Sequence, residues 1–360
     1  MSGIAYLGPP IQHRDSLCLA FRKIGVELTQ VYDYLSWPGR SDSPLQSSLA
    51  ARGARVQAQF FGTNDERYLE ETLRILDEAH ITHVLAFWGT RPLADIKALK
   101  RRRPHLKFIL NVLCHPIGLT PLTVKLQHLV MGSAMKSLDG LVVSSAYMQK
   151  YFEQNVPGTA KVPTLVLPPC WSEEYARKVP VEPSDARPNV VFLGRTDWSS
   201  GQPSDNVSVS LRTLMQQGID VHYNRSPESE TSEEHACPFD GMDIDKLTNF
   251  AARFDASLIV YELGNVQRRD RFDVTVPDRL ITSVAAGIPV ALPAEGYSAC
   301  KEYLRQYGAV IEYRSMAHLA EQLRDRTMVE GLRKTAFEKA KEYRAEKLLP
   351  RLTSFLNELR

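Results

Sequence analysis

Cysteine is scarce in this sequence, and its cysteines are scattered. The five of them stand far apart, and no two form a Cys-x-x-Cys pair. An odd and dispersed set fits reduced thiols better than a disulfide framework or a zinc site. The opening residues, MSGIAYLGPP, lack the basic and apolar regions of a signal peptide. We therefore expect a cytoplasmic protein.

The sequence also lacks long apolar runs and an excess of charge of either sign. No uncharged apolar run approaches the ~20 residues of a membrane span. With 44 basic and 42 acidic residues the net charge is only +2. Such a balance gives no general attraction to nucleic acid, so we expect no nucleic-acid partner, and an anionic partner must be met by a local cluster.

One local cluster of basic residues stands out. The segment KALKRRRPHLK (97–107) holds six Lys or Arg in eleven residues. Basic charge is favoured at a helix C-terminus, so a solvated helix end is one reading. The other is contact with an anionic acceptor, or with anionic lipid at the inner face of a membrane.

Short apolar runs alternate with amphipathic helical patterns along nearly the whole chain. This alternation is typical of βαβ units with parallel sheets, and 360 residues suggest about two domains. The rhythm restarts after a polar, proline-rich stretch at 171–187. The expected strands are 3–8, 82–87, 107–113, 139–145, 163–169, 189–194, 219–224, 256–262, 288–293 and 309–313. We therefore predict the α/β class, with two Rossmann-like, doubly wound domains.

Five segments, in order, resemble the landmarks of one enzyme superfamily. They are YLGPPIQHRDSLCLAFRKIGVEL, DGLVVSSAYMQKYF, VVFLGR, FDASLIVYE and PDRLITSVAAGIPVALPAEG. This order resembles that of the nucleotide-sugar glycosyltransferases of the GT-B fold, and most closely the retaining enzymes of the glycogen synthase-like, or group 1, type. The resemblance implies two domains facing a deep cleft, 1–170 for the acceptor and 188–335 for the donor, joined by a linker at 171–187. It implies that a helix at 336–360 crosses back to the first domain.

The resemblance also implies an activity. A sugar would pass from a nucleotide-sugar donor to a glycan, a lipid or a small-molecule acceptor, with a preference for retention of configuration. The nucleotide sugar is a substrate, and neither a metal nor a cofactor is expected. Asp243 and Asp245 resemble a metal-binding Asp-x-Asp pair, but the architecture is wrong for that role and they fit helix caps better.

The segment from Pro277 to Gly287 is expected to be the donor-binding helix. A helix N-terminus carries unpaired N–H groups and a partial positive charge, which suit a diphosphate. Arg279 adds a forked cationic contact. Gly287 is expected to end the helix, and Pro289 prevents its return. The alternative is that any βα unit shows this pattern.

The donor site departs from the family in one place. Retaining relatives carry a glutamate that holds the ribose where this chain has Thr282, which cannot offer a bidentate carboxylate. Either Glu262, after the strand at 256–262, stands in for it, or the donor differs from the common ones. The expected donor-binding residues are Gly194, Arg195, Tyr261, Glu262, Pro277, Arg279, Leu280 and Thr282.

Two residues are the expected catalytic groups. Arg195 matches a basic residue that neutralises the departing diphosphate, and its alternative is a solvated loop arginine. His115 matches a histidine near the reacting sugar carbon, either as a hydrogen-bonding group or as a general base, and its alternative is a strand-end histidine satisfied by backbone. Gly8, His13 and Trp88 are expected at the acceptor or sugar.

Other functions stay open on the sequence. A sugar-nucleotide epimerase or a glycosidic phosphorylase would use the same architecture. The missing glutamate instead favours a catalytically inactive protein that binds a nucleotide or sugar as a scaffold. Fold by itself does not decide among these functions.

Overall fold

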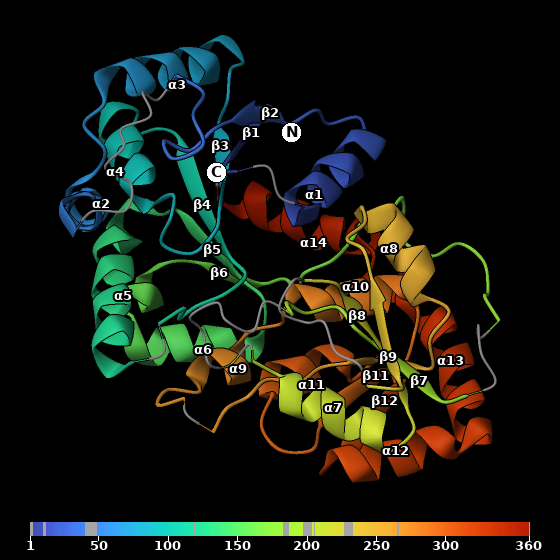
Figure 1. Ribbon diagram of the computed structural model, residues 1–360. Coiled ribbons are helices and arrows are strands. Elements are labelled where there is room, and N and C mark those ends of the chain that lie inside the picture. The colour runs from blue at the N-terminus through green and yellow to red at the C-terminus, as the bar shows by residue number, and fades with distance from the viewer. Residues whose placement is uncertain are drawn as a thin grey trace. The chain divides into compact units, whose positions relative to one another are not determined.

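The computed structural model shows two compact α/β units (Figure 1). The first comprises Met1–Pro169 and Leu348–Arg360, and the second comprises Cys170–Lys347. The structure describes residues 3–9, 12–39, 49–118, 120–182, 187–196, 204, 206–226, 233–264 and 266–359.

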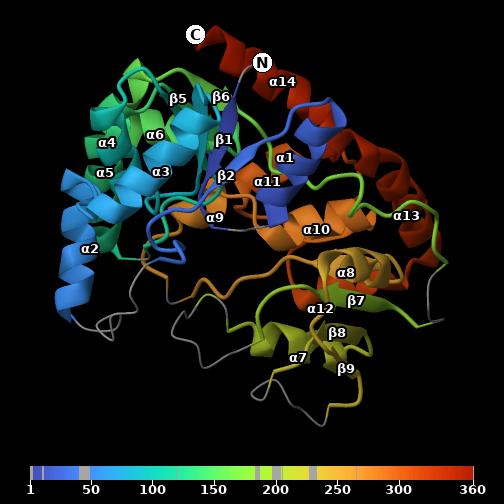
Figure 2. The same ribbon diagram turned by 90° about the horizontal axis from the view of Figure 1, so that it is seen from above.

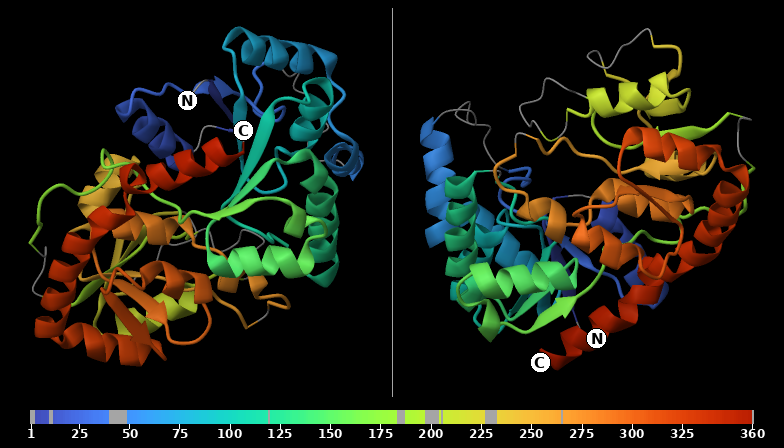
Figure 3. Two further views of the ribbon diagram at one scale, coloured as in Figure 1. Left: turned by 180° about the vertical axis from the view of Figure 1, so that it is seen from behind. Right: turned by 90° about the horizontal axis from the view of Figure 1, so that it is seen from below.

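The first unit is a six-stranded parallel sheet with strand order β2-β1-β3-β4-β5-β6. Helices cover both of its faces, with α2, α4 and α5 on one side and α1 and α14 on the other (Figure 1; Figure 3, left). Its elements are β1 (Ile4–Leu7), α1 (Gln12–Lys23), β2 (Thr29–Val31), α2 (Leu49–Phe61), α3 (Glu66–Glu78), β3 (His83–Phe87), α4 (Leu93–Arg102), β4 (Lys107–Val112), α5 (Pro121–Ala134), η2 (Met135–Ser137), β5 (Gly140–Val143), α6 (Ala146–Asn155), η3 (Thr159–Lys161) and β6 (Thr164–Val166).

The second unit repeats this architecture with strand order β12-β11-β10-β7-β8-β9, again all parallel. Its elements are β7 (Asn189–Phe192), α7 (Ser208–Gln216), β8 (Asp220–Asn224), β9 (Ala236–Phe239), α8 (Ile244–Ala251), β10 (Ala256–Leu258), α9 (Asp270–Val274), α10 (Asp278–Ala286), β11 (Val290–Pro293), α11 (Ser298–Leu304), β12 (Val310–Tyr313), α12 (Met316–Arg324), α13 (Arg326–Ala340) and η5 (Lys341–Tyr343). The chain then enters α14 (Ala345–Glu358), which belongs to the first unit from Leu348 onward.

The core of the second unit lies on both faces of its sheet. Apolar side chains of α7 and α12 pack on one face, and those of α8, α10 and α11 pack on the other. Figure 2 shows α8 and α10 on one side of β7 and β8, with α7 on the opposite side. The predicted fold class, α/β with two doubly wound parallel sheets, is confirmed.

Two edge strands were absent from the sequence prediction. β2 has only three residues, of which Val31 alone is buried, and the residues of β9 are half-buried or exposed. Edge strands that are short and partly solvated show neither the long apolar run nor the clear alternation by which strands are recognised.

The segment after Pro169 was expected to be a linker, yet its first residues are part of the second unit. Trp171 is 5% exposed and lies in that unit's core. The Ser172 hydroxyl donates a hydrogen bond to Glu346 Oε1 at 2.7 Å. The final helical stretch, expected as one helix over 336–360, is divided into α13, η5 and α14. Of it, only Leu348–Arg360 joins the first unit, where Phe355 packs beside Gly140 of β5.

Candidate functional site

The expected donor residues of the second unit follow two neighbouring strands. Gly194 and Arg195 come just after β7, and Tyr261 and Glu262 come just after β10. Because β10 pairs with β7 in parallel, these segments leave the same edge of the sheet. Ligands of doubly wound sheets bind at the carboxyl ends of the strands, so this edge is where a site is expected.

Arg279, in the first turn of α10, reaches this edge and lies against two aromatic rings. Its guanidinium carbon is 4.3 Å from the ring centroid of Tyr261 and 5.1 Å from that of Phe192. Its Nη1 donates to the Val260 carbonyl at 3.4 Å. No acidic side chain pairs with Arg279 in the part of the chain that the structure describes, so its positive charge is available to an anion.

Gly194 is the residue that makes room for this arginine. A β-carbon built at Gly194 would lie 2.5 Å from Arg279 Nη1 and 2.3 Å from Phe192 Cζ. Both separations are shorter than the distances at which β-carbons approach non-bonded heavy atoms in proteins. A glycine is therefore needed for the guanidinium to lie where it does.

The helix predicted between Pro277 and Gly287 is confirmed. α10 spans Asp278–Ala286, with Pro277 as an extended N-cap and Gly287 as a left-handed C-cap at φ 62° and ψ 47°. No side chain caps the N-terminus of α10. Its first backbone N–H groups are therefore not used by a capping side chain, and the one acidic group already in this turn is the Asp278 carboxylate beside Arg279.

The side chains of three expected donor residues make contacts inside the second unit. Thr282 is 5% exposed, and its hydroxyl donates to the Asp278 carbonyl at 3.1 Å. Leu280 is fully buried in the core, so only its backbone can face a ligand. Glu262 is half-buried, and its carboxylate accepts a hydrogen bond from the Gly264 N–H at 3.1 Å.

Arg195 is exposed beside this cluster. It forms neither an ion pair nor a hydrogen bond within the described ranges. The residues 197–203, which follow it, lie outside those ranges. An unpaired guanidinium just beyond a strand can move toward charge that develops on a ligand.

In the first unit, the expected residues also follow strands. Gly8 follows β1, Trp88 follows β3 and His115 follows β4. A β-carbon at Gly8 would lie 2.7 Å from the Phe87 carbonyl oxygen, and its φ is 149°, so this turn requires glycine. His13 lies in α1, but its side chain is outside the described part of the structure.

His115 is enclosed by its own unit. It is 1% exposed, with ring centroids 4.9 Å from Phe152 and 5.6 Å from His128. Burial, reinforced by His128, lowers the pKa of His115 to about 3. The imidazole is therefore neutral at physiological pH and too weakly basic to take a proton there. Its Nε2 is buried and has no hydrogen-bond partner among the described residues, so the hydrogen-bonding role stays a prediction that needs the ring to become accessible to a sugar.

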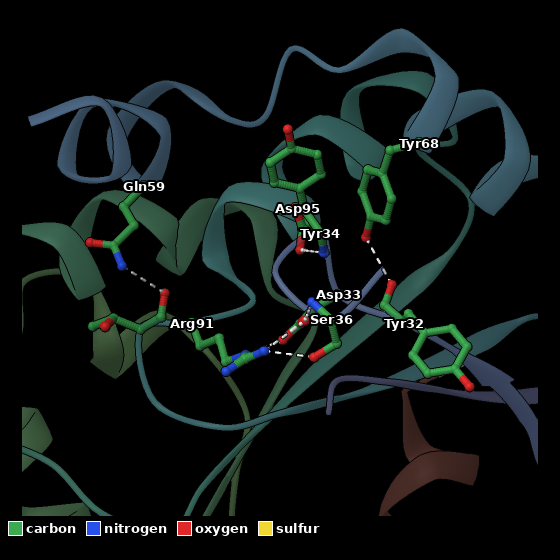
Figure 4. A network of polar contacts seen from close by, with 9 residues as sticks. Tyr32, Asp33, Tyr34, Ser36, Gln59, Tyr68, Arg91 and Asp95 are labelled. Carbon is green, nitrogen blue, oxygen red and sulfur yellow. Dashed lines mark hydrogen bonds and ion pairs between the residues drawn. The ribbon is translucent and has the colours of Figure 1, made fainter. Parts of the chain in front are cut away.

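A polar network at the carboxyl ends of β2 and β3 was missed by the sequence analysis (Figure 4). Arg91 donates through Nε and Nη2 to the Asp33 carboxylate, and through Nη2 to Ser36 Oγ at 2.6 Å. Asp33 is fully buried. Its signal, an acidic residue just after a strand, was hidden because β2 itself was not recognised.

Asp95 lies in the same network, near the start of α4. The carboxylate accepts a hydrogen bond from the Tyr34 N–H at 3.0 Å and is 2% exposed. Burial raises the pKa of Asp95 to about 7, and the negative charge of Asp33 adds to this effect. A buried carboxyl that titrates near neutrality beside a strand end is typical of functional sites, although ion-pair networks also produce it.

Comparisons with known proteins give no match by sequence and several by structure. Neither a protein-family model nor a curated protein matches the sequence. A sucrose-phosphate synthase from Thermosynechococcus elongatus matches with TM-score 0.68 and 12% identity, over 100% of both chains. The Anabaena protein HepE with UDP-glucose matches with TM-score 0.63 and 11% identity, over 99% of this chain and 100% of that one. A glycosyltransferase from Rickettsia africae matches with TM-score 0.60 and 11% identity, over 100% and 99%.

The chain has the GT-B fold. At these identities the likeness shows the fold alone, and one fold hosts many functions. Within the described residues, no three His, Cys, Asp or Glu side chains are grouped to hold a metal ion. None of the helices described is long and apolar enough to cross a membrane.

Proposed function

We propose that this GT-B chain transfers a sugar from a nucleotide-sugar donor to an acceptor. The observation that carries the proposal is the contact of Arg279 with Gly194 and Tyr261 at the uncapped N-terminus of α10. A fixed cation beside a helix N-terminus favours a diphosphate through charge-assisted hydrogen bonds and the helix dipole. The second unit therefore holds the donor.

In this proposal, Arg279 and Arg195 have different tasks. Arg279 is held by two aromatic rings and binds the diphosphate of the intact donor. Arg195 is exposed and has no partner among the described residues, and it stabilises the negative charge that grows on the diphosphate as the glycosidic bond breaks. Catalysis rests on positioning and on charge stabilisation by these residues.

The proposal extends to the donor, the stereochemistry and the acceptor. Anabaena HepE has been crystallised with UDP and with UDP-glucose, so uridine diphosphate sugars are the first donors to test. Retention of configuration is preferred in our proposal because the motifs of the second half resemble the retaining branch, and because burial, which encloses His115 and lowers its pKa, makes it a poor general base. The acceptor, a glycan, a lipid or a small molecule, is placed at the strand ends of the first unit around Gly8 and Trp88.

One observation favours a second candidate, an inactive protein that binds a nucleotide sugar. Thr282 stands where retaining relatives carry a ribose-binding glutamate, and its hydroxyl is already used by the Asp278 carbonyl. The proton of the Thr282 hydroxyl is therefore not available to the ribose. A binding protein without turnover would tolerate that loss more easily than an enzyme would.

A contact of the cytoplasmic protein with an anionic membrane through 97–107 stays a prediction. Four of the six basic residues of this segment are already paired with carboxylates. Within the described residues Lys97 and Arg101 have no acidic partner, and of these two only Arg101 is exposed, so such a contact would depend on Arg101.

The deciding experiment combines binding with turnover. Thermal shifts in the presence of UDP, other nucleoside diphosphates and UDP-glucose identify the nucleotide, since a ligand at a hundredfold excess over its Kd stabilises by about 2.7 kcal/mol. Release of nucleoside diphosphate from the nucleotide sugar then reports activity. Turnover that is lost in Arg195→Ala but kept in Arg212→Ala, an exposed arginine of α7, supports the enzyme. Tight binding without turnover supports the inactive protein, and no binding of any nucleotide overturns both.

A further inference from the structure

A second feature of the first unit is independent of the proposed transfer site. An open hollow of about 890 Å³ lies among α2, α4, the η2 turn and η3. Leu138 and Val162, which line it, come just before β5 and β6. The hollow is therefore at the amino ends of these strands, whereas Gly8, Trp88 and His115 follow the carboxyl ends.

The charge of this hollow has one sign only. Four of its lining residues are basic, and none is acidic. The basic residues are Lys97, Arg101, Lys136 and Lys161. Lys97 is 6% exposed, while the other three are exposed to solvent. Like charges that converge on one hollow repel each other, and an anion bound there would relieve this repulsion.

The six basic side chains of segment 97–107 fall into two groups: four form ion pairs and two line this hollow. Lys100 and Lys107 pair with Asp139 at 2.8 and 3.7 Å. Arg102 pairs with Glu66 and Arg103 with Asp77, both at 2.7 Å. Within the described residues, Lys97 and Arg101 have no acidic partner, and they are the two that line the hollow.

The backbone around these cations is shaped to hold them. Lys97 Nζ donates to the carbonyls of Gln59 and Phe60 and to Ser133 Oγ, which uses its three protons on neutral acceptors. A β-carbon at Gly62, whose φ is +99°, would lie 2.5 Å from Arg101 Nη2. The chain therefore places a buried ammonium behind the hollow and leaves space for a guanidinium at its edge.

We propose that this hollow binds a phosphate monoester, with Arg101, Lys136 and Lys161 as direct ligands and Lys97 as a buried charge behind them. A phosphate monoester carries nearly two negative charges at neutral pH and offers three acceptor oxygens, which matches several converging donors better than a single carboxylate does. The volume accommodates the organic part of the ester as well as the phosphate. The ester is either a soluble metabolite or the headgroup of a lipid such as phosphatidic acid.

Binding of the anion has a second, independent signature. Burial, with the nearby charges of Lys136 and Arg101, lowers the pKa of Lys97 to about 8. At pH 8.5 this amine is largely deprotonated, and a bound dianion raises its pKa again. The protein should therefore take up a fraction of a proton when the ester binds. The ester contributes no proton itself, because the second pKa of a phosphate ester is about 6.

Calorimetric titration with glycerol 3-phosphate tests the proposal. The full-length protein should carry Arg279→Ala, so that the proposed donor site does not contribute. We expect one saturable site, weakened about tenfold or more by Arg101→Ala. The matched control is Arg102→Ala, which removes the same charge one residue away but lies outside the hollow. Its effect should stay below about threefold, because exposed charges are screened.

Proton uptake is measured at pH 8.5 in two buffers that differ in ionisation enthalpy. Lys97→Met should abolish it, whereas Arg102→Ala should leave it unchanged. Sedimentation with phosphatidylcholine vesicles, with and without phosphatidic acid, identifies the source of the phosphate. Arg101-dependent binding of the soluble ester or of the phosphatidic acid vesicles supports the site and says which source it takes. The proposal is overturned if neither ligand binds, or if Arg101→Ala and Arg102→Ala weaken binding equally.

Discussion

The guanidinium of Arg279 lies 4.3 Å from the ring centroid of Tyr261, and the two residues belong to different elements of the second unit. Tyr261 follows a buried strand, and Arg279 stands in the first turn of a helix. The contact fixes a cation at the edge of the sheet where a ligand of this fold binds. It also explains why the residue opposite them, Gly194, has no side chain.

Replacing Arg279 should weaken binding of a nucleoside diphosphate. Arg279→Ala is expected to cost about 1.5–3 kcal/mol of binding free energy, the contribution of a charge-assisted contact. Arg279→Lys should restore only part of it, because an ammonium keeps the charge but loses the planar fork that stacks on two rings. Calorimetry with the nucleoside and with its diphosphate measures the difference. Equal losses for both ligands would show that Arg279 does not contact phosphate.

Gly194→Ala should disturb the same site without the loss of any charge. The new methyl group collides with Arg279 Nη1 and Phe192 Cζ, so the guanidinium is displaced and the unit loses about 1–3 kcal/mol through overpacking. Diphosphate affinity and the melting temperature should both fall. Gly331→Ala is the matched control, because a β-carbon in that helical position of α13 meets nothing within 4 Å. It should leave affinity unchanged and raise stability slightly. An unaffected Gly194→Ala would mean that the arginine adopts another position.

Thr282→Glu tests whether the lost family glutamate can be restored. Thr282 is 5% exposed, so an unpaired carboxylate there is expected to cost several kcal/mol of stability. Thr282→Ser retains the hydroxyl bond to the Asp278 carbonyl and should cost only about 1 kcal/mol for the lost methyl group. Thermal unfolding of the free proteins measures both. A Thr282→Glu protein that melts like the wild type and binds the donor more tightly would show that the position opens toward the ribose.

Asp95 should make stability depend on pH near neutrality. Its folded pKa of about 7 lies above the unfolded value of 3.8, so the folded protein binds the extra proton between these values. Stability must therefore fall as pH rises from about 4 to about 7, by up to about 4 kcal/mol at ~1.4 kcal/mol per pKa unit. Asp95→Asn should remove this fall and be the more stable protein above pH 7.

Asp77 provides a control for Asp95 because its pKa is shifted in the opposite direction. A hydrogen bond from Arg103 lowers the pKa of the exposed Asp77 carboxylate. Its contribution to stability is present at neutral pH and is lost as the pH falls through its folded pKa. Asp77→Asn should therefore lower stability slightly at neutral pH and remove the small further loss on acidification, without changing the slope of stability against pH in the neutral range. Unfolding midpoints measured from about pH 2 to about pH 8 separate the two, and a wild-type curve identical to that of Asp95→Asn would contradict the raised pKa.

The sequence alone determined the local features of this protein. Alternating apolar runs and amphipathic patterns were enough to predict two parallel, doubly wound sheets, because burial on both faces of a parallel sheet leaves continuous apolar strands in the sequence. The stop at Gly287 followed from its freedom to adopt positive φ together with Pro289, a purely local property. The short edge strand β2 was missed because three partly solvated residues carry no such pattern, and Asp33 was missed with it.

Only the tertiary structure decided what the polar residues do. The sequence proposed Gly194, Tyr261 and Arg279 separately, but their contact depends on the parallel pairing of β7 with β10. It likewise gave no sign that His115 is enclosed and neutral, or that two of six neighbouring cations face a hollow while four are paired. Burial, pKa and ion pairing are set by groups distant in the chain, and a sequence pattern reports only on neighbours along it.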